Sequence, residues 1–271
     1  MKINFVFLTL ITLCLVHSIN AQPVFQNNDV KISPIEDHTW VIETSDNTTM
    51  YLIEGKKKAL LIDTGTKCEK LDEVIKQVTT KPLEVALTHA HPDHAGNIRF
   101  FKEIFLHPAD TVLLDKNYKG KLAFIDEGYI FDLGKRKIEV RHMPAHTPGS
   151  IVFIDKKTNS CFTGDAFGSG QVWLQLRPVA PMKAYLESVK KMQEIMDEGI
   201  TKLYCGHYYY TGEKALGVNY LESMRKLAET LIAGDLSKAQ PYDIKVSIGC
   251  DNPMLVSEGE AGIVFDPDHL K

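Results

Sequence analysis

The 271-residue sequence has few of the features that mark repetitive, nucleic-acid-binding or membrane-spanning proteins. It has five cysteines but no Cys-x-x-Cys pair, no low-complexity tract and no repeat at a fixed short period. It has no excess of positive charge, because 31 Lys and Arg face 35 Asp and Glu. This balance argues against nucleic acid or an anionic membrane surface as the main partner. The rest of the composition, 44% hydrophobic and 24% charged, is that of a globular chain with a packed core.

The longest apolar run lies at the N-terminus. Lys2 precedes an apolar run over residues 5–16, and small or polar residues then lead to Ala21. This order is typical of a secretory signal peptide cleaved after Ala21. The apolar run is shorter than a transmembrane helix normally requires. We therefore expect residues 1–21 to be removed and the protein to be periplasmic or secreted, without stable insertion in a membrane.

Four cysteines follow the expected signal peptide, namely Cys68, Cys161, Cys205 and Cys250. An oxidising compartment would allow disulfides, but the spacing of these residues defines no connectivity. Cys161 and Cys205 lie in apolar, strand-like runs, where a cysteine is usually a small buried hydrophobic residue. The sequence leaves the pairing open.

The hydrophobic pattern predicts two successive groups of strands, each with helices. The first group has predicted strands over 39–43, 50–53, 59–62 and 83–87, with a helix over 70–80. The second has predicted strands over 104–106, 129–133, 137–141, 151–154, 161–163, 203–205 and 261–265, with helices over 109–114, 182–196 and 218–232. Two sheets packed together, with helices outside, satisfy this order. We predict a single α/β domain over residues 22–271, built as a four-layer αββα sandwich.

Metal-binding side chains are concentrated in residues 88–96, Thr-His-Ala-His-Pro-Asp-His-Ala-Gly. Within six residues this segment offers the imidazoles and carboxylate of His89, His91, Asp93 and His94. A zinc ion takes about four such ligands in tetrahedral order. Four donors on one turn point in divergent directions, so two ions are a simpler interpretation than one.

The backbone of this segment is expected to form a strand-to-helix turn. The predicted strand over 83–87 ends at the segment, Pro92 bars helix before Asp93, and Asp93 is a good cap for a short helix through 99–101. The donors would then lie at the rim of a sheet, where α/β folds commonly bind ligands. This position favours a metal site over accidental clustering of histidines.

Two ions need more ligands than one segment supplies, and three more candidates lie at predicted strand ends. His146 lies on a turn between two strands, in Pro-Ala-His-Thr-Pro-Gly-Ser. Asp165 follows a strand in Thr-Gly-Asp-Ala-Phe, and His207 follows another in Leu-Tyr-Cys-Gly-His.

Together these residues resemble the metallo-β-lactamase superfamily, whose pattern is His-x-His-x-Asp-His followed in order by a His, an Asp and a His. All seven positions are filled, and the match spans residues 39 to about 210. Asp63, in Leu-Ile-Asp-Thr-Gly, also matches a strand-end acid that the superfamily carries near its site. The resemblance implies the αββα fold and a metal-dependent hydrolase.

The resemblance also implies two zinc ions per chain, with iron or manganese as alternatives. It assigns His89, His91 and His146 to one ion, assigns Asp93, His94 and His207 to the second, and makes Asp165 the bridge together with a water or hydroxide. Asp63 would accept a hydrogen bond that fixes a ligand imidazole. The alternative for Asp63 is a turn-forming aspartate before Gly65.

The expected chemistry follows from the ions. A bridging hydroxide is activated at neutral pH, and the metals stabilise the oxyanion of a tetrahedral intermediate. Asp93, beside the bridging position, is expected to act as a catalytic residue that orients the hydroxide and passes a proton to the leaving group.

The substrate is expected to be a small ester, thioester or lactone. A bridging aspartate at Asp165 favours the thioesterase and lactonase branch, whereas a secreted location favours a β-lactamase. Residues 213–271 show one clear helix, which poorly matches the basic helical domain of glutathione thioesterases. The alternatives are a metallo-β-lactamase, a mononuclear iron persulfide dioxygenase, for which several ligands are redundant, and a non-catalytic metal-binding protein, which would not need a bridged pair.

Several aromatic residues are candidates for the pocket wall. These are Trp173, Phe167 and the Tyr208-Tyr209-Tyr210 run, and ordinary packing is the alternative for each. Arg177 is a candidate for binding a substrate carboxylate, and a solvated arginine is the alternative.

Overall fold

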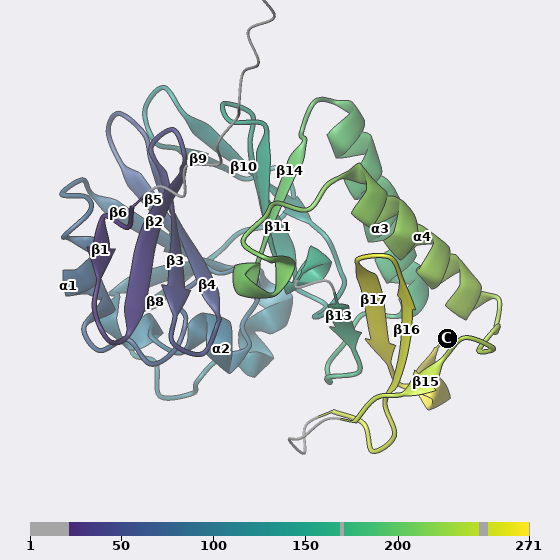
Figure 1. Ribbon diagram of the computed structural model, residues 1–271. Helices are drawn as coiled ribbons and strands as arrows, with labels where there is room; N and C mark the ends of the chain where they lie inside the picture. Colours follow the sequence, from purple (N-terminus) through teal and green to yellow (C-terminus); the bar gives the residue numbers. More distant parts are fainter. Residues whose placement is uncertain (1–21, 169–170, 244–248, 271) are drawn as a thin grey trace, which may run out of the picture.

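The first sheet contains eight strands that follow one another in chain order (Figure 1). The computed structural model describes residues 22–168, 171–243 and 249–270, so the expected signal peptide lies outside the described residues. The strands are β1 (Phe25–Gln26), β2 (Val30–Glu36), β3 (Thr39–Thr44), β4 (Thr49–Glu54), β5 (Ala59–Ile62), β6 (Leu83–Ala86), β7 (Glu103–Leu106) and β8 (Lys121–Phe124). Pairing is antiparallel from β1 to β5 and parallel from β5 to β8. The predicted antiparallel meander over 39–62 is confirmed.

The second sheet has five strands in the order β14-β12-β11-β10-β9. They are β9 (Ile130–Asp132), β10 (Lys137–His142), β11 (Ile151–Asp155), β12 (Ser160–Gly164) and β14 (Lys202–Cys205). Both predicted hairpins are present, β9 with β10 and β11 with β12. β14 pairs parallel with β12 after the chain has crossed through helix α3 (Met182–Asp197).

A third, smaller sheet was not predicted. Its order is β13-β17-β16-β15, with β13 (Gln171–Leu174), β15 (Gln240–Pro241), β16 (Met254–Glu258) and β17 (Ala261–Phe265). It lies below helix α4 (Val218–Ile232) at the lower right of Figure 1, and α4 contacts β16 and β17. The segment after residue 213 therefore contributes three strands, where the sequence predicted one.

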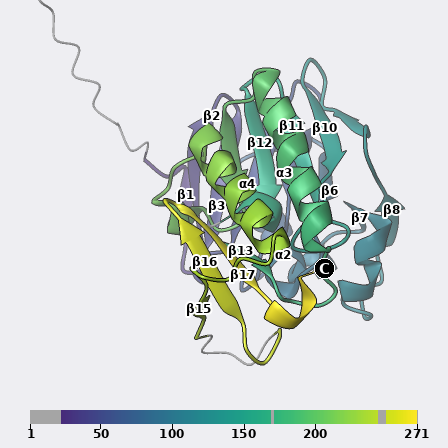
Figure 2. The same ribbon diagram turned by 90° about the vertical axis from the view of Figure 1, so that its right-hand side faces the viewer.

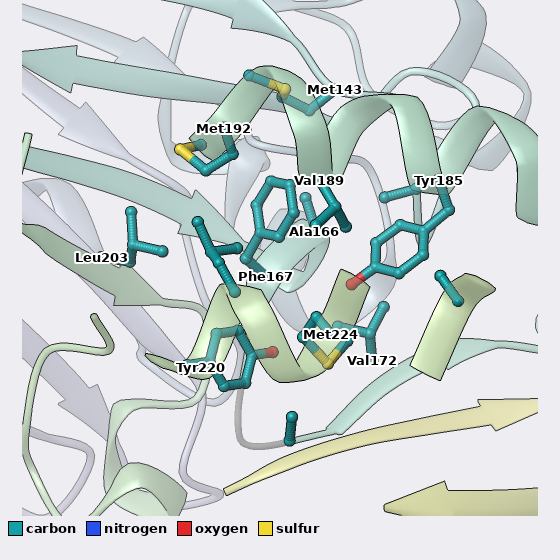
Figure 3. Close-up of a cluster of buried hydrophobic side chains, with 14 of the residues drawn as sticks. Met143, Ala166, Phe167, Val172, Tyr185, Val189, Met192, Leu203, Tyr220 and Met224 are labelled. Carbon is teal, nitrogen blue, oxygen red and sulfur yellow. The ribbon is translucent and has the colours of Figure 1, made fainter. Parts of the chain in front are cut away.

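Three buried clusters separate four layers of secondary structure. Side chains such as Tyr51, Phe131 and Phe153 fill the space between the first two sheets. Leu71 and Val74 of helix α1 (Leu71–Ile75) pack on the outer face of the first sheet. α3 and α4 lie side by side over the second sheet (Figure 2), and their buried side chains form part of the cluster in Figure 3. The predicted αββα arrangement is confirmed.

Two helices in the first half differ from their predictions. α1 ends at Ile75 rather than near residue 80, because the chain must turn back into β6 and the Thr79 hydroxyl donates to Glu54. The prediction that Asp93 caps a helix through 99–101 was wrong. Helix α2 (Pro92–Ala95) begins at Pro92, whose fixed φ suits the first helical position, and η1 (Ile98–Phe100) is a separate 3₁₀ turn.

No disulfide joins the four cysteines after residue 21 in the described part of the chain. Cys161 and Cys205 are buried, as predicted for small core residues, and burial raises the pKa of the Cys161 thiol. No described helix is long and apolar enough to cross a membrane.

Candidate metal centre

Strand ends bring the predicted site residues to one edge of the molecule. β5 and β6 run parallel, so Asp63 follows one strand where residues 88–94 follow the other. In the second sheet β12 and β14 run parallel and end beside each other, which places Asp165 near His207. His146 lies on the turn between β10 and β11. Apart from His146, which follows the antiparallel strand β10, these residues lie at the carboxyl ends of parallel strands, where α/β sheets place their ligands.

The structure brings all seven predicted donors into two adjacent groups. One ligand atom from each of His89, His91 and His146 lies within 4.8 Å of the others, and the same holds for Asp93, His94, Asp165 and His207. In the first group, His91 Nδ1 and His146 Nε2 are 2.8 Å apart. Asp165 lies between the groups, with its Oδ2 3.8 Å from His146 Nε2 and 3.3 Å from His207 Nε2.

Hydrogen bonds on the far side of three rings fix which nitrogen faces the centre. The Nδ1 atoms of His94, His146 and His207 lie 2.9, 2.6 and 3.1 Å from the Asp63 carboxylate, the Trp173 carbonyl and the Asn47 carbonyl. These acceptors require a proton on each Nδ1. The Nε2 atom of each ring therefore points into the centre, as in imidazoles that bind a metal.

Asp63 has the contacts that were predicted for it. Its Oδ2 accepts from His94 Nδ1 and, at 2.8 Å, from the Thr88 hydroxyl, while Oδ1 accepts from Thr88 N at 2.7 Å. Asp63 is buried and has a positive φ of 63°. It therefore orients a candidate ligand and also fixes the backbone just before the metal-binding segment.

The charges of the two groups are complementary to a cation. Burial lowers the pKa of His89 well below its ordinary value and that of His91 to about 4, so these imidazoles are neutral. Burial also lowers the pKa of His207, but Asp165 and Asp93 outweigh it and raise the value to about 10. The two carboxylates thus attract positive charge to the position where a second ion would bind.

Unpartnered polar atoms show that a divalent metal fits this centre. His89 Nε2, His94 Nε2 and Asp165 Oδ1 are buried, and none of them makes a hydrogen bond among the described residues, although His94 Nε2 and Asp165 Oδ1 lie 3.4 Å apart. Such atoms cost about 1–3 kcal/mol each unless a ligand satisfies them. Five imidazoles and two carboxylates form a donor set that suits zinc and related divalent ions.

Asp110, which the sequence did not single out, links the two loops of the first group. It is a buried residue of the 3₁₀ helix η2 (Pro108–Leu113), just after β7. Its Oδ2 accepts from Ala90 N at 3.1 Å and from the Thr147 hydroxyl at 2.8 Å, and its Oδ1 accepts from Gly149 N at 2.8 Å. Ala90 lies between two candidate ligands and Thr147 follows a third. One carboxylate therefore sets the distance between the loop that contains Ala90 and the loop that contains Thr147.

Gly206 was also missed, and the site leaves no space for a side chain there. A Cβ at Gly206 would lie 2.3 Å from Asp165 Oδ1 and 2.6 Å from His94 Cε1. Glycine is therefore required for the backbone to pass this close to two candidate ligands.

A third grouping, His107, Asp126 and His142, does not fit a metal ion. His107 Nδ1 accepts from Ala109 N, so its Nε2 carries the proton, which points to Asp126 Oδ1 at 3.3 Å. The His107 and His142 rings are stacked 4.1 Å apart at 14°. A metal ion bound by an imidazole nitrogen lies in the plane of that ring. Two nearly parallel, stacked rings have no shared in-plane position for one ion.

A cavity of about 1160 Å³ opens beside the centre. Two residues proposed for its wall, Trp173 and Tyr210, do line it, and so does Arg177, which was proposed to bind a substrate carboxylate. The proposal for Phe167 was wrong, because Phe167 is buried against Tyr185 in the helix-covered core (Figure 3).

The other two tyrosines of the run do not line this cavity. Tyr208 is buried in the cluster between the first two sheets, and Tyr209 is exposed outside the cavity. Arg177 lines the cavity but forms an ion pair with Asp266 at 2.8 Å. The sequence did not predict that Tyr242, from the C-terminal part of the chain, would contribute to the wall.

Comparison with known proteins identifies the family. The model of the metallo-beta-lactamase superfamily matches residues 44–207. Acyl-coenzyme A thioesterase MBLAC2 of Gallus gallus is 26% identical over 216 residues, which cover 64% of this chain and 77% of that protein. Hydroxyacylglutathione hydrolase GloC of Haemophilus influenzae is 28% identical over 183 residues, covering 58% of this chain and 84% of that protein.

Solved structures give the same result for the fold. The metallo-beta-lactamase from Pontibacter korlensis superposes with a TM-score of 0.59 at 18% identity and covers 74% of this chain and 99% of its own. The di-iron-bound form of TTHA1623 gives a TM-score of 0.50 at 29% identity, covering 59% of this chain and 87% of its own. The family match spans more than half of the chain and includes all seven candidate ligands, so the protein belongs to the metallo-beta-lactamase superfamily and is a metal-dependent hydrolase.

Proposed function

We propose that this protein is a dinuclear zinc hydrolase, periplasmic or secreted, that cleaves a small ester, thioester or lactone. One observation carries the proposal: seven donors form two adjacent groups that share Asp165 at the floor of an open cavity. His89, His91 and His146 would hold one ion, and Asp93, His94 and His207 the other, with Asp165 shared. Two zinc ions would supply a Lewis acid and a water of lowered pKa.

Asp93 is the side chain we propose for proton transfer. Its carboxylate lines the cavity and is 41% exposed, which gives it access to substrate. Burial raises the pKa of Asp93, but His94 and His207 outweigh it and hold the pKa below its usual range. Asp93 is therefore a carboxylate at neutral pH. Its Oδ2 would accept a proton from the attacking water and return it to the leaving group.

Thioesters come first among the proposed substrates. Two relatives are named as an acyl-coenzyme A thioesterase and a hydroxyacylglutathione hydrolase, and both names describe the cleavage of an acyl group from a thiol. The metallo-beta-lactamase of Pontibacter korlensis, at 18% identity, supports the fold alone and adds nothing in favour of a lactam.

The test combines elemental analysis with a hydrolysis panel on the purified protein. We expect two zinc ions per chain and clear activity on thioesters, among thioesters, lactones, lactams and phosphodiesters. The variant His91→Ala should lose about 10³-fold or more in kcat/KM, because the metal supplies several kcal/mol of transition-state stabilisation. His38→Ala removes an exposed histidine outside the centre and serves as the control.

Each competing function predicts a different result. One iron per chain with oxygen uptake would indicate a persulfide dioxygenase, and rapid opening of a chromogenic cephalosporin would indicate a β-lactamase. Metal-free protein, or thioester cleavage unchanged by a chelator, would refute the proposed mechanism.

The location is supported by the composition of residues 1–21. N-terminal sequencing of the chain recovered from periplasm or medium should begin at Gln22. Protein found in the cytoplasm with Met1 intact would contradict this part of the proposal.

A further inference from the structure

The cavity beside the metal centre has a polar floor and apolar walls. His91, Asp93, His146, Asp165 and His207 form the floor. Leu113, Trp173, Leu176 and Tyr242 contribute to the walls. A substrate whose reacting carbonyl lies on the floor must therefore place the rest of its structure against largely apolar side chains.

The aromatic part of the wall is held in place next to the candidate ligands. The Trp173 and Tyr242 rings meet edge to face, with centroids 5.9 Å apart and an interplanar angle of 78°. Trp173 lies on β13, and its carbonyl accepts from His146 Nδ1 at 2.6 Å. The Tyr242 hydroxyl donates to Gln171 Oε1 at 3.0 Å. These bonds fix an apolar surface beside the position of the reacting carbonyl without any rearrangement.

The described wall offers little to an anionic group. Among the described residues that line the cavity, Arg177 is the one lysine or arginine, and it donates to Asp266 Oδ2 at 2.8 Å. Asp266 also accepts from His269 Nδ1. An anionic substrate group would have to compete with this carboxylate for the guanidinium.

We infer that the cavity binds an apolar acyl group against Trp173, Leu176 and Tyr242, and that the acyl group, not charge on the leaving thiol or alcohol, sets specificity. This inference rests on the proposed thioester and ester hydrolysis. Burial of each additional methylene on this wall should raise kcat/KM about fourfold, until the cavity is filled.

The test uses zinc-loaded protein and two series of straight-chain thioesters, from acetyl to octanoyl. One series carries the neutral thiol N-acetylcysteamine, and the other carries the polyanionic coenzyme A. We expect kcat/KM to rise about fourfold per methylene in both series. At equal chain length, kcat/KM for the two series of thioesters should differ by less than about tenfold.

Three variants test whether these wall side chains cause the dependence of kcat/KM on acyl chain length. Trp173→Ala and Leu176→Ala should each cost octanoyl thioesters about tenfold more in kcat/KM than acetyl thioesters, mainly through KM. Two variants are used so that one still tests the wall if the loss of the other side chain impairs folding. Tyr209→Ala removes a neighbouring exposed tyrosine outside the cavity and should leave the dependence on chain length unchanged.

The outcomes separate this inference from the proposed function. Cleavage that is independent of chain length, or a preference of tenfold or more for coenzyme A, would overturn the inference and leave the hydrolase intact. The inference is also wrong if the wall variants lower acetyl and octanoyl activity equally. No cleavage of any thioester or ester by zinc-loaded protein would refute the proposed function itself.

Discussion

Each candidate imidazole ligand with an anchored Nδ1 depends on a group that lies outside the centre. His94 uses the Asp63 carboxylate, whereas His146 and His207 use the carbonyls of Trp173 and Asn47. A carboxylate acceptor makes the ring a stronger donor to a metal than a carbonyl does. The second group of donors therefore combines the most basic imidazole with most of the negative charge, and we expect it to retain its ion at least as well as the first group.

At the residue scale, Asp110→Asn tests whether one carboxylate positions the first group. The amide keeps the shape of the side chain, but its NH₂ would face one of the donors Ala90 N, Gly149 N or the Thr147 hydroxyl. We expect zinc at one of the two sites to bind about 10–100-fold more weakly, as for other residues that orient ligands. Chelator competition and zinc stoichiometry measure this change. Cobalt substitution would report an altered absorption band for one ion.

The matched control for this variant is Asp155→Asn. Asp155 is also a buried carboxylate, but it pairs with Arg136 and contacts no candidate ligand. The substitution Asp155→Asn should lower the denaturation midpoint and leave zinc affinity unchanged. If Asp110→Asn binds both ions with wild-type affinity, its carboxylate has no positioning role.

The residues that the sequence revealed and those it missed differ in how they act. His89, His146, Asp165 and His207 were predicted because their side chains suit a metal and each follows a predicted strand. Asp110 and Gly206 act through atoms of distant loops that approach them only in the folded chain. A lone aspartate in a polar turn and a glycine after a strand have many ordinary roles, so their type alone did not distinguish them.

At the scale of elements, Arg136 joins the two central sheets. It lies on the turn between β9 and β10 and is buried. Its guanidinium pairs with Asp155 of the second sheet and donates to the Thr39 hydroxyl and the carbonyls of His38 and Glu54 in the first.

Replacing this guanidinium should be costly. Arg136→Met would leave the buried Asp155 carboxylate without its cationic partner and would remove the guanidinium donor from several carbonyls, so we expect the free energy of unfolding to fall by about 3–5 kcal/mol. Urea denaturation measures the change. Arg225→Met removes an exposed helix pair with Glu229 and should cost less than about 0.5 kcal/mol. If the two variants lose the same free energy of unfolding, Arg136 contributes no more to stability than an exposed arginine does.

Glu54 ties the end of β4 to the segment after α1, and this tie should depend on pH. Burial raises the pKa of Glu54, but the bonds from Lys81 Nζ at 2.7 Å and the Thr79 hydroxyl at 2.5 Å outweigh it and lower the pKa. The folded state therefore holds this proton more weakly than the unfolded state does. Its contribution to stability is present above the ordinary value of 4.5 and is lost as pH falls through the lowered pKa.

The variant Glu54→Gln tests the direction of this effect. At pH 7 it should lower the free energy of unfolding by roughly 1 kcal/mol, since it removes a charge-assisted pair that is partly exposed. The difference from the wild type should shrink as pH falls from about 5 to 3 in urea titrations. A difference that stays constant or grows in acid would mean that the carboxylate is not held in its ionised form.

The sequence predicted a strand where the hydrophobic pattern of the segment itself is clear. It missed strands that are stabilised mainly by pairing with other strands. β3, β4 and β5 have apolar or alternating runs that identify them without partners. β2 was missed because Pro34 interrupts its run. The ladder with β3 has an irregularity there, and β1 pairs only with Lys31 and Ile32, so no partner needs the missing N–H.

The third sheet depends on contacts far apart in the chain. β13 pairs with β17, whose residues follow it by about 90 positions, as in Val172 with Ile263. Runs of four or five residues, such as Gln171–Leu174 and Met254–Glu258, are too short to show the period of a strand locally. As a result, the sheet was not foreseeable, and neither was the contact that Tyr242 makes with Trp173 beside the centre.

At the scale of the whole molecule, the candidate metal centre spans two halves that are otherwise joined by the core between the sheets. Four of the donors follow β6 of the first sheet, and three lie at ends of strands in the second. Direct bonds also cross between the halves, among them Thr49 N to Gly206 O and Ile151 N to Thr88 O. Bound ions would therefore stabilise contacts between halves that the protein already forms in part.

Removal of metal should loosen these loops without unfolding the sandwich. At a free metal concentration 1,000 times Kd, each bound ion adds about 4 kcal/mol, so a chelator that removes both ions should lower the thermal midpoint by about 20 °C. Amide hydrogen exchange should rise in residues 88–96, 144–150 and 205–210, whereas β4 and β11 should stay protected because the core around Tyr51 and Phe153 contains no ligand. Exchange that is unchanged in these loops would show that the ions add no constraint between the halves. Loss of protection throughout β4 and β11 would show instead that the core alone does not hold the sheets together.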